Sequence, residues 1–142
     1  AYHSDFRRAR AAGVNIIPTT TSATRVIKAV FPELKQKIMG SSFRVPVING
    51  SITEFIVDVE QNINSITILD IFKKEIEHRY QDVIGITEDK IVSSDAIGCK
   101  LAALVDVNSI EVVGNTLKLT AFYDNESGYS YQLLQLVLAN NN

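Results

Sequence analysis

Two groups of side chains in this sequence have the chemistry to bind an anion. The first is the segment at residues 18–22 (PTTTS), which stands directly before apolar residues at helical spacing. A helix start offers free backbone N–H groups and the positive end of a dipole, and hydroxyls there can donate to an anion as well. The same segment fits an ordinary helix cap after a threonine-rich strand end. A phosphate site and a plain cap therefore both remain open.

The second group consists of arginines. Arg44 interrupts an apolar strand, and Arg7, Arg8 and Arg10 form a basic cluster in an N-terminal loop. A planar guanidinium can bind two phosphate oxygens at once, which makes each of them a candidate anion ligand. The alternative is a solvated strand residue for Arg44 and a solvated or salt-bridged loop for the cluster.

Cys99 is the only cysteine, so no intrachain disulfide can form, which fits a reducing compartment. A nucleophilic thiol needs a base, and the two histidines, His3 and His78, are far from Cys99 in sequence. We therefore expect Cys99 to be chemically inert. The sequence also has no His/Cys cluster that predicts a structural zinc site.

The composition is that of a globular domain. The 142 residues are 46% hydrophobic and 21% charged, with a net charge of −2. This charge gives no reason to expect nucleic acid or a membrane as partner, and no apolar run reaches the roughly 20 residues of a membrane span. The chain lacks an initiator Met and opens at Ala1 with a polar, arginine-rich stretch, so we expect a piece of a longer protein. Simple removal of an initiator Met is the alternative.

Apolar periodicity predicts three helices and several short strands. The helices cover 23–31, 65–80 and 128–139, the last buried through Tyr131, Leu134, Val137 and Leu138. Pro32 ends or kinks the first helix. The expected strands are 14–17, 43–47, 52–60, 83–86, 90–93, 100–107, 109–113 and 117–123, with a hairpin turn at Gly114-Asn115. Asp124 and Asn125 suit a turn and a helix cap.

These elements predict an α+β fold with a mixed, largely antiparallel sheet covered by helices. Residues 1–142 are expected to form one partial domain, with no Rossmann half in this chain.

Seven stretches, in register over nearly the whole chain, resemble the C-terminal catalytic domain of the glyceraldehyde-3-phosphate dehydrogenase family. They are residues 5–12 (DFRRARAA), 15–21 (NIIPTTT), 31–34 (FPEL), 43–46 (FRVP), 86–89 (ITED), 92–95 (VSSD) and 123–130 (YDNESGYS). The opening AYHSD resembles the erythrose-4-phosphate dehydrogenase branch, whereas the triple threonine resembles the glyceraldehyde branch.

The resemblance implies roles for five residues and shows a departure from the family at a sixth site residue, Ser22. Thr21 matches a threonine that binds phosphate at a helix start. Arg44 matches an arginine that clamps the substrate phosphate, and Arg8 matches an arginine near the inorganic phosphate site. Ser22 stands where the family usually has glycine, which puts the close approach of backbone to phosphate in doubt. Asn125 matches the asparagine that holds the nicotinamide carboxamide, and Tyr129 the tyrosine beside the nicotinamide ring.

The resemblance also implies what the parent protein would be: a cytoplasmic, NAD-dependent, phosphorylating aldehyde dehydrogenase of glycolysis, tetrameric as in the family. Its partners would be a phosphorylated aldehyde and inorganic phosphate. The family's nucleophile lies in a Ser-Cys-Thr-Thr-Asn-Cys motif that these 142 residues lack, so we expect no catalysis from this chain alone. We also expect NAD, the cofactor of the parent protein, not to bind tightly to this chain alone. The alternatives are an erythrose-4-phosphate dehydrogenase fragment and a non-enzymatic binding or assembly module. The choice of NAD or NADP stays open.

Overall fold

The computed structural model describes residues 2–140, and the chain divides into two compact units. The N-terminal unit ends at Ile48 and the C-terminal unit begins at Asn49. Both are built of short helices and strands, and the predicted α+β class is confirmed. Within residues 2–140, none of the helices is both long and apolar enough to cross a membrane.

The N-terminal unit is organised around a two-stranded antiparallel ribbon. It pairs β1 (Ile17–Thr19) with β2 (Ser42–Arg44), so that Ile17 lies opposite Arg44 and Thr19 opposite Ser42. The strand predicted over 14–17 is wrong, because a short 3₁₀ helix (Ala12–Val14) precedes β1 and Pro18 lies inside β1. A proline is tolerated there because both strands of a two-stranded sheet are edges. The strand predicted over 43–47 ends earlier, at Arg44.

Helix α1 (Ala23–Val30) follows β1 directly and confirms the predicted helix. Pro32 ends it rather than kinking it, since residues Pro32–Leu34 form a separate 3₁₀ turn. No residue of α1 is buried in the structure, and its apolar side chains Val26 and Val30 are more than half exposed.

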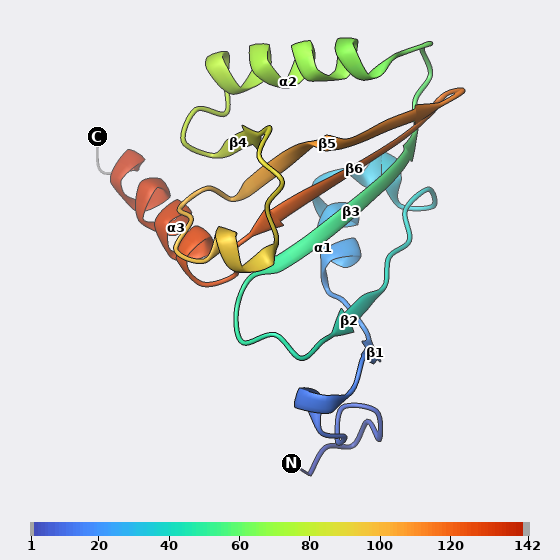
Figure 1. Cartoon of the computed structure of the whole chain (residues 1–142), viewed down its shortest axis with the longest axis vertical. Coiled ribbons are helices and arrows are strands. Elements are labelled where there is room, and N and C mark those ends of the chain that lie inside the picture. Colours follow the sequence, from blue (N-terminus) through green and yellow to red (C-terminus); the bar gives the residue numbers. More distant parts are fainter. Residues whose placement is uncertain (1, 141–142) are drawn as a thin grey trace. The chain divides into compact units, whose positions relative to one another are not determined.

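The C-terminal unit is a four-stranded sheet in the order β3-β6-β5-β4 (Figure 1). The strands are β3 (Ser51–Asp58), β4 (Ile84–Thr87), β5 (Ala103–Val113) and β6 (Thr116–Tyr123). All pairs are antiparallel except β4 with β5, so the predicted mixed, largely antiparallel sheet is confirmed. Gly114 supplies the positive φ (63°) of the predicted turn between β5 and β6.

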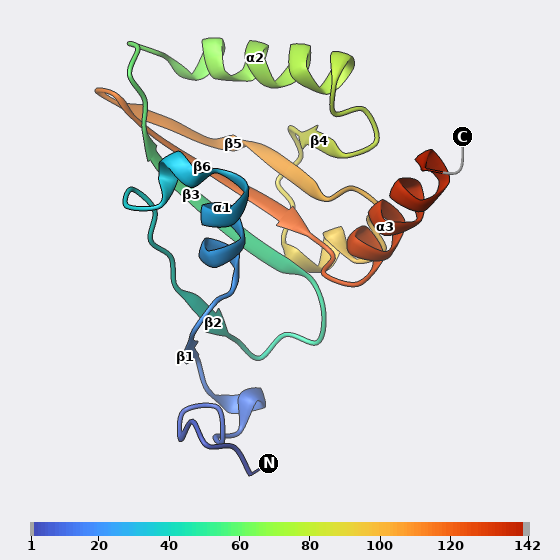
Figure 2. The ribbon, with the colours of Figure 1, turned by 180° about the vertical axis from the view of Figure 1, so that it is seen from behind.

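One face of this sheet carries the core. Alternate residues Leu117, Leu119 and Ala121 of β6 point to the same side and pack with Ile68 of α2 (Ser65–His78). Figures 1 and 2 show α2 lying along that side of the sheet. The other face is more polar: Lys118 forms ion pairs there with Glu54 (3.9 Å) and Glu111 (3.4 Å).

Three predicted elements of this unit need correction. Residues 90–93 form no strand; a 3₁₀ helix (Ser93–Ala96) begins there instead. The two strands expected over 100–107 and 109–113 are one continuous strand, β5. Its pairing with β6 shifts register between Asp106 and Glu111, where the Ser109 hydroxyl accepts the Thr120 N–H (2.8 Å) in place of a main-chain carbonyl.

Helix α3 (Ser127–Ala139) was predicted to be buried through its apolar side chains, and this is wrong. Leu134, Val137 and Leu138 are each about half exposed. The helix is instead held near its start, where Gly128 is buried against the chain: a Cβ at this position would lie 2.6 Å from the Leu101 carbonyl oxygen.

Candidate functional site

Arg8 contacts the threonine segment before α1. Its Nη2 donates to Thr20 Oγ1 (2.8 Å) and to the Thr20 carbonyl oxygen (3.2 Å). Its Nε lies 3.6 Å from a carboxylate oxygen of Asp5. Arg8 and Thr20 are 12 positions apart, so the loop before β1 has folded back onto the ribbon. The result places a guanidinium one residue from Thr21.

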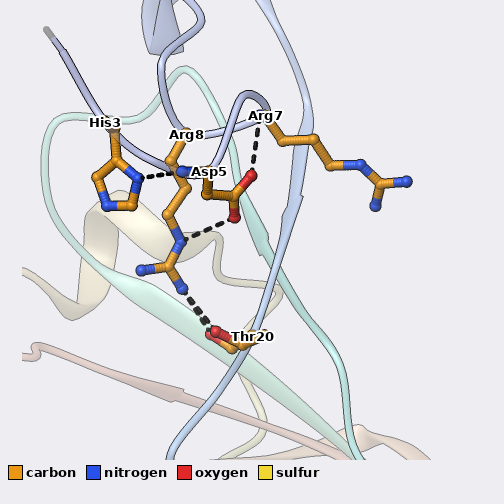
Figure 3. Close-up of polar contacts among 5 residues, drawn as sticks. All are labelled: His3, Asp5, Arg7, Arg8 and Thr20. Carbon is orange, nitrogen blue, oxygen red and sulfur yellow. Dashed lines mark hydrogen bonds and ion pairs between the residues drawn. The ribbon is translucent and has the colours of Figure 1, made fainter.

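The loop itself is ordered by Asp5. The other Asp5 oxygen accepts the Arg7 backbone N–H (2.9 Å), and the Asp5 N–H donates to His3 Nδ1 (2.9 Å). Figure 3 shows Arg8 extended toward Thr20, whereas the Arg7 guanidinium points away from this cluster. Of these two neighbouring arginines, the structure therefore selects Arg8 for the candidate site.

The start of α1 is capped by Thr21 rather than by Ser22. The Thr21 hydroxyl accepts the Ala23 N–H (3.1 Å), whereas Ser22 makes no side-chain capping bond. Ser22 has right-handed helical backbone angles (φ −83°, ψ −12°), which any residue adopts without strain. The serine in place of the family's glycine is thus compatible with this backbone conformation.

Arg44 is the last residue of β2 and lies opposite Ile17, the first residue of β1. Thr21 lies two residues beyond Thr19, where β1 ends. The structure therefore brings Arg8 to the threonine segment and places Arg44 farther along the same ribbon. The convergence of Thr21 and Arg44 on one anion stays a prediction.

The two residues implied to contact nicotinamide flank the start of α3 in the C-terminal unit. Asn125 precedes the helix, and its amide oxygen accepts the Ser51 hydroxyl (3.3 Å). Tyr129 lies on the first turn and is 69% exposed. Both side chains can therefore reach a ligand from this end of the helix.

Sequence reasoning missed the role of Asp124, which is 2% exposed. One of its oxygens accepts the N–H groups of Glu126 (2.7 Å) and Ser127 (2.9 Å), the first residues of the α3 turn. The other accepts the Gly98 N–H (2.8 Å) and the Asn49 side-chain amide (3.1 Å). The helix-cap interpretation of Asp124 is confirmed, but the partners 26 and 75 positions away carried no local signal.

These hydrogen bonds favour the charged carboxylate. The Gly98 N–H contributes most, followed by those of Ser127 and Glu126, and together they hold the pKa of Asp124 far below its ordinary value despite burial. The Asn49 amide acts in the same direction. Asp124 is therefore a buried anion whose four donors come from three segments of the chain.

Cys99 lies in the turn between the Ser93–Ala96 helix and β5 and is partly buried. Its backbone N–H donates to the Ala96 carbonyl (3.0 Å). Within residues 2–140, no group of three or more His, Cys, Asp or Glu side chains is arranged to hold a metal ion.

Comparison with known proteins agrees with this arrangement of an α+β domain. Residues 1–125 match the family described as glyceraldehyde 3-phosphate dehydrogenase, C-terminal domain. The chain is 42% identical over 130 residues to a glyceraldehyde-3-phosphate dehydrogenase of Haloarcula vallismortis, covering 92% of this chain and 39% of that protein. It is 43% identical over 137 residues to glyceraldehyde-3-phosphate dehydrogenase 2 of Streptomyces avermitilis, covering 96% and 41%.

A third relative, glyceraldehyde-3-phosphate dehydrogenase 1 of Bacillus cereus, is 38% identical over 135 residues, covering 94% of this chain and 40% of that protein. The chain belongs to the family of glyceraldehyde-3-phosphate dehydrogenase C-terminal domains. It spans about two fifths of the length of these relatives.

Proposed function

We propose that this chain is the phosphate-binding and nicotinamide-facing part of an NAD-dependent, phosphorylating glyceraldehyde-3-phosphate dehydrogenase. The observation that supports it most directly is the contact of Arg8 with Thr20, beside the Thr21-capped start of α1. A guanidinium, hydroxyls and a helix start gathered in one place are the groups that bind a phosphate dianion.

The chemistry of the phosphate site follows from the free donors. Arg8 uses Nη2 on Thr20 and turns Nε toward Asp5, and the side chains of this ion pair are each more than a third exposed. Such an exposed pair is worth at most about 1 kcal/mol, so an incoming phosphate can compete with Asp5 for the guanidinium. Thr21 and Ser22 would donate hydroxyls, and Arg44 would clamp the phosphate of the aldehyde substrate.

The nicotinamide side rests on Asn125 and Tyr129. NAD, when bound, supplies the hydride acceptor. The Asn125 amide would orient the ring through its carboxamide, and the exposed Tyr129 ring would lie beside it. We propose that the nucleophilic thiol and its base lie in other parts of the parent enzyme, that the parent is a cytoplasmic homotetramer, and that this chain alone does not turn over substrate.

The runner-up function is an erythrose-4-phosphate dehydrogenase, favoured by the opening AYHSD. A third possibility is a non-enzymatic binding or assembly module that keeps the fold. Both dehydrogenase branches would use the same phosphate-binding residues. A phosphate-binding experiment therefore separates the two dehydrogenase functions from the non-enzymatic module.

The test is titration of the chain with inorganic phosphate, followed by amide NMR signals. We expect shifts concentrated at Thr20, Thr21 and Ser22, with affinity reduced roughly tenfold or more in Arg8→Ala, because a charged hydrogen-bond partner is lost. Arg44→Ala should have a comparable effect if both arginines serve one anion.

Arg7→Ala is the matched control, because it removes the same charge from a neighbouring residue whose guanidinium points away from the cluster. We expect its phosphate affinity to stay within about twofold of the original chain, since exposed charges act weakly at a distance in salt. Equal losses in Arg7→Ala and Arg8→Ala would show that only net charge matters and would contradict the site.

A further inference from the structure

Helix α3 is positioned by polar contacts rather than by apolar packing. Its apolar side chains are about half exposed, and Gly128 is its only buried residue in the structure. Its contacts include hydrogen bonds, in which Gln132 Nε2 donates to the carbonyls of Asp82 (2.8 Å) and Lys100 (3.2 Å) and Asp124 holds the first turn. The Lys100 ammonium also lies 5.5 Å from the centre of the Tyr131 ring. Where apolar burial is small, such contacts decide where a helix lies.

Asp124 does more than a helix cap requires. A cap needs only the oxygen that accepts the Glu126 and Ser127 N–H groups. The second oxygen is bound to Gly98 and Asn49, which belong to two other loops of the C-terminal unit. The carboxylate thus joins the start of α3 to both loops at once.

The Asn49 loop also contacts Asn125 directly. Asn49 Oδ1 accepts the Gly50 N–H (2.7 Å), which leaves its amide nitrogen for Asp124. Two residues later, the Ser51 hydroxyl donates to the Asn125 amide oxygen. This bond fixes the oxygen end of the Asn125 amide, which keeps a second lone pair, and the amide nitrogen can donate to a ligand carbonyl.

Gly50 shapes the Asn49 loop between these two contacts. Its φ of 87° lies in the left-handed region, and a Cβ there would collide with the Ser93 carbonyl oxygen. Glycine at this position therefore lets the loop pass close to Ser93 while Asn49 and Ser51, on either side of it, bind Asp124 and Asn125.

We propose that Asp124 is a positioning residue, which together with Asn49 fixes Asn125 and the first turn of α3 for contact with a nicotinamide ring. This inference rests on the proposed role of Asn125 and Tyr129 toward the cofactor. It adds that the residue which positions this contact is a buried carboxylate that touches no ligand itself. Loss of the Asp124 carboxylate should disturb nicotinamide binding and leave phosphate binding at Arg8 and Thr21 unaffected.

Two variants test this on the full 142-residue chain. Asp124→Asn keeps the shape but turns an NH₂ group toward two N–H donors. Asn49→Ala removes one of the four hydrogen bonds to Asp124, together with the bond that Asn49 accepts from the Gly50 N–H, and alters no residue of α3. Asp58→Asn is the control: this exposed aspartate accepts only the Thr116 hydroxyl among the described side chains, at the opposite end of β3 from Ser51.

The first readout is the side-chain NH₂ signal pair of Asn125 in NMR spectra. We expect it to shift in Asp124→Asn and Asn49→Ala and to stay in place in Asp58→Asn. The second readout is the affinity for nicotinamide riboside, a probe that has no phosphate. It should fall roughly tenfold in Asp124→Asn, and by less in Asn49→Ala, while inorganic phosphate still shifts Thr21 as before.

An unchanged Asn125 signal in Asn49→Ala would overturn the proposal, as would an unchanged riboside affinity in a folded Asp124→Asn. Equal loss of riboside and phosphate binding would also overturn it, because Asp124 would then support only the fold. If Asp124→Asn does not fold, Asn49→Ala decides. If the original chain shows no response to the riboside, the proposed cofactor contact fails, and the Asn125 signals still decide whether Asp124 positions that side chain.

Discussion

The carboxylate of Asp124 accepts two hydrogen bonds at each oxygen, so the fold favours its charged form. The pKa of Asp124 is therefore lower in the folded chain than in the unfolded one, where an aspartate titrates at about 3.9. At a pH between the folded and the unfolded pKa, the unfolded chain binds more protons than the folded chain. The stability that Asp124 contributes is fully present above about pH 4 and is lost as the pH falls below it.

We expect Asp124→Asn to lower the melting temperature at pH 6, with the gap to the original chain narrowing as the pH drops below about 4. The reason is that below about pH 4 the unfolded chain takes up a proton at Asp124 that folding must release, whereas the asparagine side chain does not titrate. Thermal melts followed by circular dichroism between pH 6 and 2.5 measure the melting temperatures of the original chain and of Asp124→Asn. Asp58→Asn should show a much smaller gap, and a gap for Asp124→Asn that is independent of pH would contradict the linkage.

The residue scale also shows how far local sequence goes. The Thr21 cap and the helix-capping half of Asp124 involve partners two or three positions away, and local pattern predicts them. The bonds of Arg8 to Thr20 and of Asp124 to Asn49 join residues 12 and 75 positions apart. Only a fold-level match could anticipate such contacts, because no local pattern encodes which loops meet.

At the scale of elements, the hairpin at Gly114 was predictable because a positive-φ glycine between alternating strands has one common solution. The prediction split the long strand β5 at Asn108, the residue left between the two expected strands. Ser109 instead replaces a ladder bond with its hydroxyl, which keeps the strand continuous through the register shift. The burial of α3 was overestimated because periodicity and apolar content do not say what covers a helix.

An element-scale prediction concerns the close approach of α3 to the Leu101 carbonyl. Gly128→Ala should destabilise the chain by about 1–2 kcal/mol, because the new Cβ would lie 2.6 Å from a backbone oxygen. The better helix propensity of alanine, worth up to about 1 kcal/mol, offsets only part of this. Urea denaturation measures the change in midpoint.

Ser130→Ala is the control for this substitution, since it also introduces alanine into the first part of α3 but at an exposed position. We expect a change within about 0.5 kcal/mol. A Gly128→Ala chain as stable as the original would show that α3 can move away from Leu101, and would also weaken the case that its start is rigidly positioned.

At the scale of the whole molecule, the chain carries candidate binding residues but no matching catalytic nucleophile. The described units carry the candidate phosphate-binding residues around Arg8 and the candidate nicotinamide-binding residues around Asn125. The family reaction also needs a thiolate to attack the aldehyde and a base to activate it. The 142 residues contain one cysteine, Cys99, in a glycine-lysine context unlike the family's nucleophile motif.

We therefore expect the chain by itself to reduce no NAD when supplied with glyceraldehyde-3-phosphate and inorganic phosphate. Formation of NADH, followed by its absorbance, is the measurement, and repurification removes activity that a contaminating host dehydrogenase contributes. The same assay is run on Cys99→Ser, which eliminates the only thiol without altering the phosphate-binding residues. Turnover that survives repurification and disappears in Cys99→Ser would make Cys99 a nucleophile and would overturn both the expected inactivity and the inert role of this thiol. Turnover that survives in both forms would mean that NAD is reduced without a covalent thiol intermediate, and would place the chain outside the chemistry of its relatives.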